Sequence, residues 1–148
     1  MATTTQENIA ASRRLIEEAL NRGSYDVLDE VCADGFVDHD PMLGKQDKEA
    51  VKQTITGYRG AFPDLHCEIE EIFDAGDRVV YRWSANGTFE NSFMGLEPTH
   101  EKGDPVRGMT IDRYDADGKV AESWSQWDTL TFMRDVGAVP QAAEALSA

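Results

Sequence analysis

Apolar residues recur at helical spacing near the start of the chain. Between residues 6 and 21, Ile9, Ile16 and Leu20 place one apolar stripe along a helix. Gly23 follows that stripe and suits the end of a helix. The pattern therefore predicts a first helix over residues 6–21 with one face buried.

Two further helices follow from the same period. Residues 24–33 repeat apolar side chains at steps of three and four, beginning at a serine that suits a helix cap. Residues 45–62 repeat them again, with Asp47 placed to cap the helix and Pro63 placed to end it. Each helix has a single apolar face, so the three must pack against a sheet or against each other.

Beyond residue 64 the period changes from helical to the alternation of strands. The pattern predicts strands at 65–70, 78–86, 109–114 and 120–128, a bulged strand within 87–99, and a short helix at 130–136. The run Asp115-Ala116-Asp117-Gly118 is typical of a hairpin turn between two of these strands.

Helices followed by hairpin-linked strands indicate an α+β protein with an antiparallel sheet. The length of 148 residues fits one domain, so we expect a single domain over residues 1–148 with a frayed tail at 141–148. A strongly curved sheet wrapped over helices leaves a pocket at its open end, which is the place to look for a ligand.

Charge and composition narrow the classes of partner. The chain has 28 acidic and 14 basic residues and a net charge of -14, which argues against binding to nucleic acid or to an anionic membrane surface. It has no apolar run near the ~18 residues of a membrane helix and no secretion signal at its start. We therefore expect a soluble cytoplasmic protein.

The acidic excess has two interpretations. Lysine contributes only 5 residues and aspartate 15, a balance that would suit a salt-rich cytoplasm, while ordinary acidic drift explains it equally well. Cys32 and Cys67 are far apart, belong to no CxxC pair and fall in apolar patterns, so we expect both to be buried and neither to bind a metal.

Candidate chemistry is concentrated in the last predicted strand. Glu122, Trp124, Gln126 and Asp128 alternate and so share one face. Two carboxylates, an indole and an amide suit the lining of an amphipathic pocket better than a dry core. A carboxylate beside an indole can serve as a general acid or base. Equally, Asp128 stands where it could cap the final helix.

His39 is the histidine with the most suggestive setting. It lies between Asp38 and Asp40, but three consecutive residues of extended chain do not converge on one metal ion. The alternatives are a loop histidine bonded to a neighbour and a histidine at the pocket rim that polarises a ligand carbonyl. His66 falls on the polar face of its strand and is expected to be solvated.

Several short motifs, in this order and spacing, resemble one known family. They are Phe36-Val37-Asp38-His39-Asp40-Pro41, Ala61-Phe62-Pro63-Asp64-Leu65, Gly76-Asp77-Arg78-Val79-Val80, Gly87-Thr88, and Gly118-Lys119-Val120-Ala121-Glu122-Ser123-Trp124 ending at Asp128. Over about residues 9–140 the chain resembles the SnoaL-like ester cyclases, also called polyketide cyclases, of the NTF2-like superfamily. The resemblance implies a cone-shaped α+β fold.

The resemblance also implies a reaction and a set of residues. The reaction is a cofactor-independent aldol ring closure on a hydrophobic polyketide ester. Asp128 would be the acid/base that removes or returns a proton, and His39, with Gln126, would donate hydrogen bonds to the oxygen of the enolate that results. The remaining expected substrate-binding residues are Glu122, Trp124, Trp83, Tyr81, Arg82, Phe62 and Met109. No cofactor or metal is implied.

The family further implies a homodimer joined through the outer sheet face, with Trp127 as a candidate contact. Two departures from the family pattern fall at the predicted pocket mouth. Phe89 follows Gly87-Thr88 where relatives often have histidine, and the loop over 96–106 is longer and more charged.

Two other functions fit the same fold. One is a non-catalytic ligand-binding or stress-associated dimer that uses only the pocket. The other is an epoxide hydrolase, in which two aspartates and an arginine activate water. Arg82 and Asp128 could supply two of those groups, but the sequence offers no convincing second aspartate.

Overall fold

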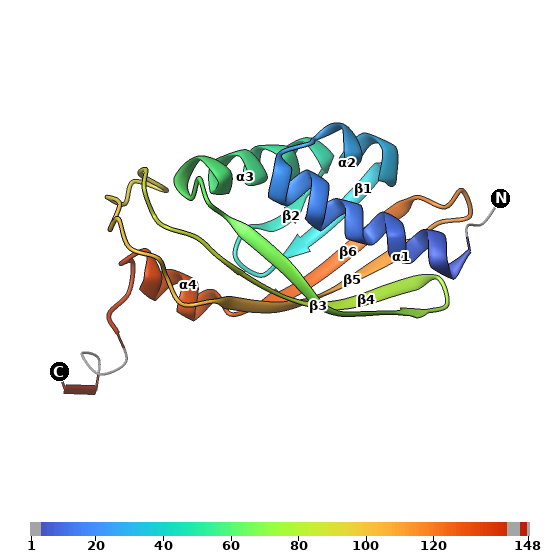
Figure 1. Cartoon of the computed structure of the whole chain (residues 1–148). Helices are drawn as coiled ribbons and strands as arrows, with labels where there is room; N and C mark the ends of the chain where they lie inside the picture. The colour runs from blue at the N-terminus through green and yellow to red at the C-terminus, as the bar shows by residue number, and fades with distance from the viewer. Residues whose placement is uncertain (1–3, 142–145, 148) are drawn as a thin grey trace.

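Helices cover one face of a curved six-stranded sheet in the computed structural model of the chain (Figure 1). The structure describes residues 4–141 and 146–147. Most of the tail predicted at 141–148 lies outside these described residues. Figure 1 places α1, α2 and α3 along one side of the sheet, and α4 at the end where the chain leaves it.

The first predicted helix is confirmed, although its hydrogen bonding changes midway. Helix α1 spans Thr5–Arg14, and a π-helical segment, η1, continues it over Leu15–Leu20. Thr4 begins the helix with a capping box, in which its hydroxyl accepts from the backbone of Glu7 and the Glu7 carboxylate accepts from the backbone of Thr4.

The second and third helices are also confirmed. Helix α2 spans Asp26–Val31, and helix α3 spans Lys48–Ala61. The Asp47 carboxylate accepts a hydrogen bond of 2.8 Å from the backbone nitrogen of Ala50, which satisfies one of the free donors at the start of α3.

The sheet has the order β2-β1-β6-β5-β4-β3. Its strands are β1 (Cys32–Asp40), β2 (Gly44–Gln46), β3 (His66–Ala75), β4 (Arg78–Asn86), β5 (Val106–Tyr114) and β6 (Val120–Trp127). Helix α4 (Thr129–Asp135) follows β6 directly. The predicted α+β class is confirmed, as are the β3–β4 and β5–β6 hairpins.

The expectation of an antiparallel sheet is wrong at one position. Strand β1 pairs with β6 in parallel, with Val37 opposite Glu122 and His39 opposite Trp124. The sequence pattern assigned residues 32–33 to a helix and the rest of β1 to a loop. Strand β1 shows no clean alternation because its register shifts between Cys32 and Val37, so the period of two is lost.

The bulged strand predicted within 87–99 is also wrong. This segment is part of a long connection between β4 and β5 that holds only two isolated bridges, Thr88 with Lys102 and Phe93 with Leu96. Its backbone groups pair within the connection, for example from His100 nitrogen to the carbonyl of Phe89 at 2.8 Å. The connection folds on itself rather than adding a strand to the sheet.

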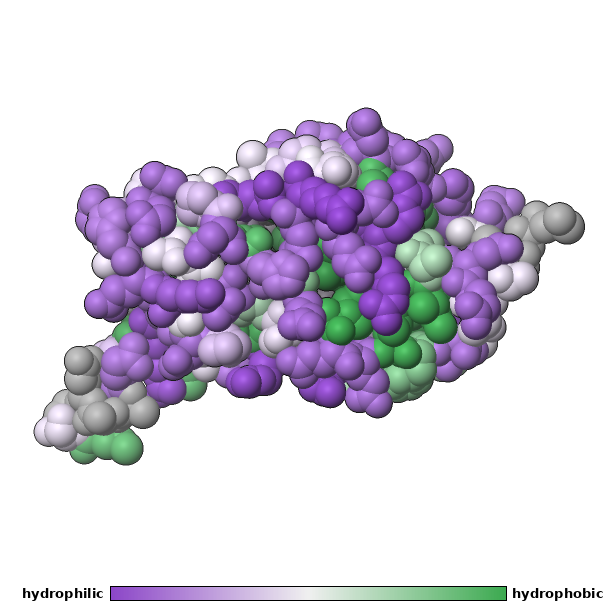
Figure 2. Space-filling view, in the orientation of Figure 1, coloured by the Kyte–Doolittle hydropathy of each residue, from purple (hydrophilic) through white to green (hydrophobic). Residues whose placement is uncertain are grey.

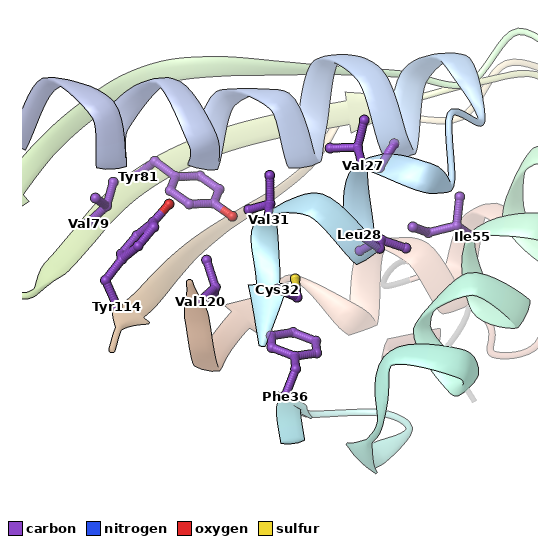
Figure 3. Close-up of a cluster of buried hydrophobic side chains, with 11 residues drawn as sticks. Val27, Leu28, Val31, Cys32, Phe36, Ile55, Val79, Tyr81, Tyr114 and Val120 are labelled. Carbon is purple, nitrogen blue, oxygen red and sulfur yellow. The ribbon is translucent and has the colours of Figure 1, made fainter. Parts of the chain in front are cut away.

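The main hydrophobic core lies between the helices and the inner face of the sheet. Val27, Leu28 and Val31 of α2 meet Val79 and the other buried side chains of the cluster in Figure 3. Both cysteines are buried, as predicted, and burial raises their thiol pKa values to about 12.

A buried carboxylate lies inside this core. Asp112 of β5 is 1% exposed and accepts hydrogen bonds from the hydroxyls of Ser12, at 2.7 Å, and Ser123, at 2.5 Å. The hydroxyl of Tyr81 donates to the same carboxylate, and Tyr114 lies 2.8 Å from the Ser12 oxygen. Burial raises the pKa of Asp112, and these donors counteract part of that effect.

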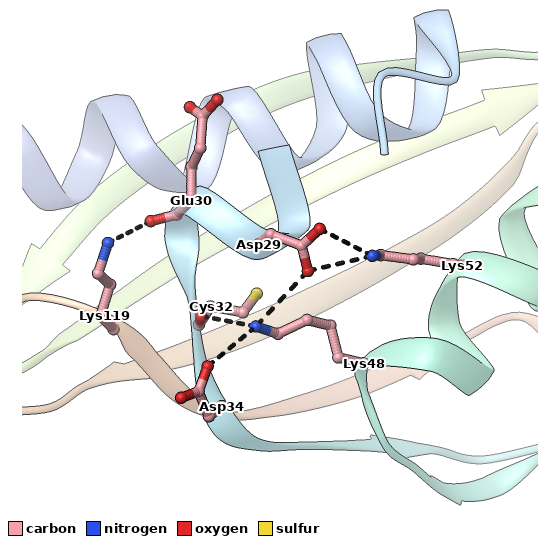
Figure 4. Close-up of polar contacts among 7 residues, drawn as sticks. All are labelled: Asp29, Glu30, Cys32, Asp34, Lys48, Lys52 and Lys119. Atoms are coloured by element: carbon pink, nitrogen blue, oxygen red, sulfur yellow. Dashed lines mark hydrogen bonds and ion pairs between the residues drawn. The ribbon is translucent and has the colours of Figure 1, made fainter. Parts of the chain in front are cut away.

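Lysine side chains connect the start of β1 to its neighbours. Lys48 of α3 donates to the carbonyl of Cys32 at 3.1 Å, and Lys52 binds both carboxylate oxygens of Asp29 (Figure 4). Lys119, just before β6, reaches the carbonyl of Glu30. These contacts hold the end of α2 against α3 and the last hairpin.

The surface is mainly hydrophilic, with apolar side chains showing between the polar ones in the middle of the face in Figure 2. In the described part of the chain, no helix combines the length and apolarity needed to cross a membrane.

We expect Ser12→Ala to lower the free energy of unfolding by about 1–2 kcal/mol. A lost hydrogen bond to a buried charge costs about 1.5–3 kcal/mol, and the better helix propensity of alanine returns about 0.5 kcal/mol. Urea unfolding measures the change, and the exposed Ser92→Ala is the control. Equal stability of both variants would mean that Ser12 does not support Asp112.

Candidate functional site

A cavity of about 200 Å³ opens at the end of the sheet that α4 and the long connection cover. Its floor is the inner face of the sheet, its roof is α3, and its closing walls are α4 and the connection. The floor residues are Trp83, Ala85, Val106, Ser125 and Trp127. The cavity is therefore built by elements from both halves of the chain.

Aromatic side chains form most of the cavity wall. Phe62 stacks on Phe89 with ring centroids 5.3 Å apart. Phe132 of α4 packs edge-on against Tyr58 at 5.8 Å and against Trp127 at 5.7 Å. Such walls favour a flat apolar ligand.

Asp40, the last residue of β1, is a carboxylate in this aromatic surrounding. One of its oxygens accepts from the backbone nitrogens of Met42 and Leu43, each at 2.8 Å. The other accepts from the indole nitrogen of Trp127 at 3.1 Å. Three donors fix the carboxylate in position at the cavity wall.

Tyr58 of α3 is the neutral polar group of the same cavity. Its hydroxyl is buried and has no hydrogen-bond partner among the described residues. Burial, with a smaller effect from the charge of Asp40, raises the pKa of Tyr58, so the phenol stays protonated at neutral pH. An unpaired buried hydroxyl is costly, and a ligand oxygen would satisfy it.

The cavity floor contains a chain of hydrogen bonds. The indole nitrogen of Trp83 donates to the Thr110 hydroxyl at 3.0 Å, which lies 2.9 Å from the hydroxyl of Ser125. Gly108 lies between Trp83 and Trp127, where a Cβ atom would come within 2.4 Å of the Trp83 indole and 2.7 Å of the Trp127 Cβ atom. A side chain at residue 108 would therefore push the floor apart.

The wall formed by the connection and the end of α4 is acidic. Glu101, Asp104 and Asp135 line it, and the backbone nitrogen of Asp104 donates to the Asp135 carboxylate. Burial raises the pKa of Asp135, and the nearby negative charges of Asp104 and Asp128 add to the effect. Gly103 lets the connection approach, because a Cβ there would lie 2.5 Å from the Asp135 carboxylate.

The predicted pocket face of β6 is on the other side of the sheet. Ser125 and Trp127 line the cavity, whereas Glu122, Trp124 and Gln126 face outward. The sequence interpretation took a pocket to be the cover of the Trp124 indole. His39 of the unpredicted strand β1 covers it instead, with ring centroids 5.5 Å apart and planes 5° apart.

Asp128 is the cap of α4. Its carboxylate accepts from the backbone nitrogen of Thr131 at 3.0 Å and from the Thr131 hydroxyl at 2.6 Å. These two hydrogen bonds lower the pKa of Asp128, the one from the hydroxyl more than the one from the backbone. Desolvation opposes them and raises the pKa in part. Asp128 is exposed and lies outside the cavity lining. Its position is that of a helix cap, one of the two alternatives that the sequence left open. Its catalytic role stays a prediction.

His39 also lies on the outer face and is not brought together with Asp128. Its Nε2 atom is 2.6 Å from the Glu122 carboxylate, which also binds Arg113 at 3.2 Å. The hydrogen bond from His39 is the main cause that lowers the pKa of Glu122. Among the described residues, no group of three or more histidine, cysteine or acidic side chains is arranged to hold a metal ion.

The other predicted binding residues are divided among three places. Phe62 and Trp83 line the cavity. Tyr81 is buried in the main core beside Asp112. Arg82 and Met109 lie on the outer face in an open depression that Gln126 and Asp128 also line. There Arg82 pairs with Glu70 and Glu71, so the structure gives no support to an aspartate–arginine–aspartate site around it.

Sequence reasoning missed Asp40, Tyr58 and Ser125. Asp40 was considered only as a metal ligand, and Tyr58 only as a member of the apolar stripe of its helix. The sequence offers one indication of Tyr58, because a tyrosine on the buried face of a helix needs a hydrogen-bond partner for its hydroxyl. The position of strand β1 had to be known before Asp40 could be placed beside Tyr58.

Asp38 is a second unusual carboxylate, next to the core. Burial, then the negative charges of Asp40 and Asp112, raise its pKa to about 7. A proton therefore leaves Asp38 in the folded protein at a much higher pH than in the unfolded chain.

The curved sheet, the covering helices and the cavity between them define an α+β protein with a cone-shaped fold. A family model for the SnoaL-like polyketide cyclases matches residues 10–136. The chain belongs to this family, as its motifs predicted. None of the curated proteins matches it significantly.

Solved structures agree on the fold. A protein named as a SnoaL-like polyketide cyclase from Jannaschia sp. CCS1 is 24% identical, with a TM-score of 0.81, over 95% of this chain and 98% of that one. AclR from Streptomyces galilaeus is 24% identical, with a TM-score of 0.80, over 93% of this chain and 100% of that one. IdmH from Streptomyces antibioticus, named as a polyketide cyclase, is 27% identical, with a TM-score of 0.73, over 91% of this chain and 99% of that one.

The raised pKa of Asp38 makes the stability of the folded protein depend on pH. Between about pH 4 and 7 the folded protein binds more protons than the unfolded chain, so the free energy of unfolding falls as pH rises through this window. We expect Asp38→Asn to be more stable than the parent above pH 7, by roughly 2–4 kcal/mol, with the difference shrinking towards pH 4. Urea unfolding at pH 4.5, 6 and 7.5 measures it.

The control for this prediction is Asp117→Asn, which removes the same charge from an exposed hairpin turn. It corrects for the general relief of repulsion in a protein of net charge -14. A parent and an Asp38→Asn variant whose stabilities run parallel across the three pH values would contradict the assignment.

Proposed function

We propose that this protein is a cofactor-independent cyclase that moves protons next to a carbonyl group of a hydrophobic, polyketide-like small molecule. The observation that carries the proposal is the cavity itself, in which a fixed carboxylate and an unpaired phenol lie among aromatic rings. Membership of the SnoaL-like polyketide cyclase family supports the choice of chemistry.

The residues have complementary roles in this proposal. The Asp40 carboxylate removes a proton from the carbon beside a ligand carbonyl, and the negative charge moves to the carbonyl oxygen as an enolate. The Tyr58 hydroxyl donates a hydrogen bond to that oxygen, which strengthens as charge develops. The enolate carbon then attacks a second carbonyl of the same molecule, and the alkoxide formed takes up the proton that Asp40 removed, which returns Asp40 to its carboxylate form.

The aromatic walls would hold the ligand and keep water from the enolate. Phe62, Phe89 and Phe132 supply flat apolar surfaces around the two polar groups. A low-dielectric surrounding strengthens each hydrogen bond made to the developing charge.

Asp128 is the competing candidate for the base, on the strength of the family resemblance. Its two hydrogen bonds from Thr131 stabilise the ionised form, and its exposure leaves that form well solvated. Asp128 also lies outside the cavity lining, whereas Asp40 and Tyr58 both line the cavity. We therefore assign the proton transfer to Asp40.

Asp40→Asn and Asp128→Asn distinguish the two assignments. With an aromatic polyketide ester in deuterated buffer, we expect Asp40→Asn to slow label exchange and ring closure at least about 100-fold, because general-base catalysis contributes about 10²–10⁴-fold. Asp128→Asn should retain both rates and change stability little, because asparagine caps a helix about as well as aspartate. Mass spectrometry follows the label, and urea unfolding follows stability.

The reverse pattern would move the role to Asp128. Exchange and closure unchanged in both variants would contradict the proposed mechanism. Binding without any turnover in the parent would favour the alternative of a non-catalytic ligand-binding protein.

We also propose that the outer face of the sheet joins two copies of the chain. One row of paired residues crosses this face from β3 to β1: Phe73, Val80, Ile111, Trp124 and His39. Phe73 is 48% and Ile111 36% exposed, so the row is a solvent-facing apolar stripe. Trp127, named as a contact from the sequence, points instead into the cavity.

Ile111→Arg should convert a dimer to a monomer, because it places a charge in the middle of this apolar row. Light scattering at micromolar concentration measures the mass. Ala116→Arg, which adds the same charge at an exposed position in the hairpin turn between β5 and β6, should leave the dimer intact. A parent protein that is monomeric under these conditions would overturn the proposal.

A further inference from the structure

The cavity is small for a ligand-binding site. Its volume is about 200 Å³. Sites for drug-sized ligands are commonly about 300–1,000 Å³, and an apolar cavity of about 150 Å³ is enough to bind benzene, a single ring. The space in this protein therefore suits a molecule of one ring or of two fused rings, and a third fused ring needs room that the walls occupy.

Phe89 of the long connection occupies the buried end of this space. It lines the cavity and yet is only 1% exposed, so its ring lies deep in the protein rather than at the opening. The ring stacks on Phe62 and belongs to a buried cluster that also contains Ala61, Val106 and Val136. Because protein interiors are closely packed, a ligand that reaches beyond this ring must displace it.

The backbone on both sides of Phe89 is held by hydrogen bonds. Thr88 donates twice to the Asp64 carboxylate, from its backbone nitrogen at 2.6 Å and from its hydroxyl at 2.8 Å. Glu90 donates from its backbone nitrogen to the carbonyl of Ala61 at 2.9 Å. The backbone nitrogen and carbonyl of Phe89 itself are both bonded within the connection. The chain that carries the ring is therefore fixed to the end of α3 and to its own connection.

Phe62, the ring on which Phe89 stacks, is also confined. It directly follows α3, and the chain at Gly87 packs closely against it. A Cβ atom at Gly87 would lie 3.1 Å from the Cβ atom of Phe62 and 3.2 Å from the Cα atom of Leu65. Neither of the two stacked rings has space to retreat, so the size of the cavity is set before a ligand arrives.

We propose that Phe89 is a specificity-determining residue that limits the ligand of this cavity to two fused rings. The inference rests on the proposed function and narrows its substrate class to a hydrophobic, polyketide-like molecule of one or two rings. Molecules with three or more fused rings are rejected by a steric clash, because their last ring would have to occupy the position of the Phe89 ring.

Two alcohols that differ by one fused ring, 2-naphthalenemethanol and 2-anthracenemethanol, test this limit. Equilibrium dialysis against the full chain, with the free probe measured by chromatography, gives both affinities. A cavity with room for it would bind the anthracene probe more tightly, because the third ring buries more apolar area. We expect the parent to bind the anthracene probe at least about tenfold more weakly than the naphthalene probe.

Phe89→Ala should reverse this order, because it opens the buried end of the cavity to the third ring. Phe93→Ala is the matched control, since it removes the same side chain from the same connection at a residue outside the cavity lining, and it should keep the preference of the parent. Phe89→Leu, a milder change in the packed cluster, should shift the ratio of affinities in the same direction by a smaller factor. Urea unfolding verifies that each variant is folded.

The outcomes separate the size limit from the proposed function. Tighter binding of the anthracene probe by the parent overturns the size limit and leaves the proposed function standing, since the cavity still binds a flat apolar ligand. A preference that persists in both Phe89 variants, or that Phe93→Ala changes equally, overturns the role of Phe89. Failure of both probes to bind the parent and the variants counts against the size limit and the proposed function together.

Discussion

The burial of the Asp112 carboxylate is the constraint on which the arrangement of this protein depends. An ionisable group removed from water costs several kcal/mol unless donors surround it. Here the donors come from Ser12 of α1, Ser123 of β6 and Tyr81 of β4. Helix α1 and strand β6 are more than a hundred residues apart, so the carboxylate fixes the N-terminal helix to the far end of the chain.

That network divides the inner face of the sheet into two regions. At one end, side chains from α1 and α2 cover the face and satisfy its polar groups. At the other end, α3 forms the roof, and the floor carries Trp83 and Trp127 on either side of Gly108, which leaves room for both side chains. The cavity lies in the second region, where α3, α4 and the long connection close over the floor without filling the space between them.

Most of the fold could be predicted from the sequence, because it depends on local periods. The helices, two hairpins and the family all follow from the spacing of apolar residues and from short motifs. Strand β1 could not be predicted, since a parallel strand beside β6 is defined by a partner about 85 residues away and its register shifts. The site depended on that strand. Without β1 the polar face of β6 was taken as the cavity face, whereas Trp124 is covered by His39.

The acidity of the chain therefore has two different physical meanings. Most carboxylates lie on the surface, where they affect solubility and response to salt. Asp40 differs because aromatic rings surround it and three donors hold it, which suits a base that must act without reorganising.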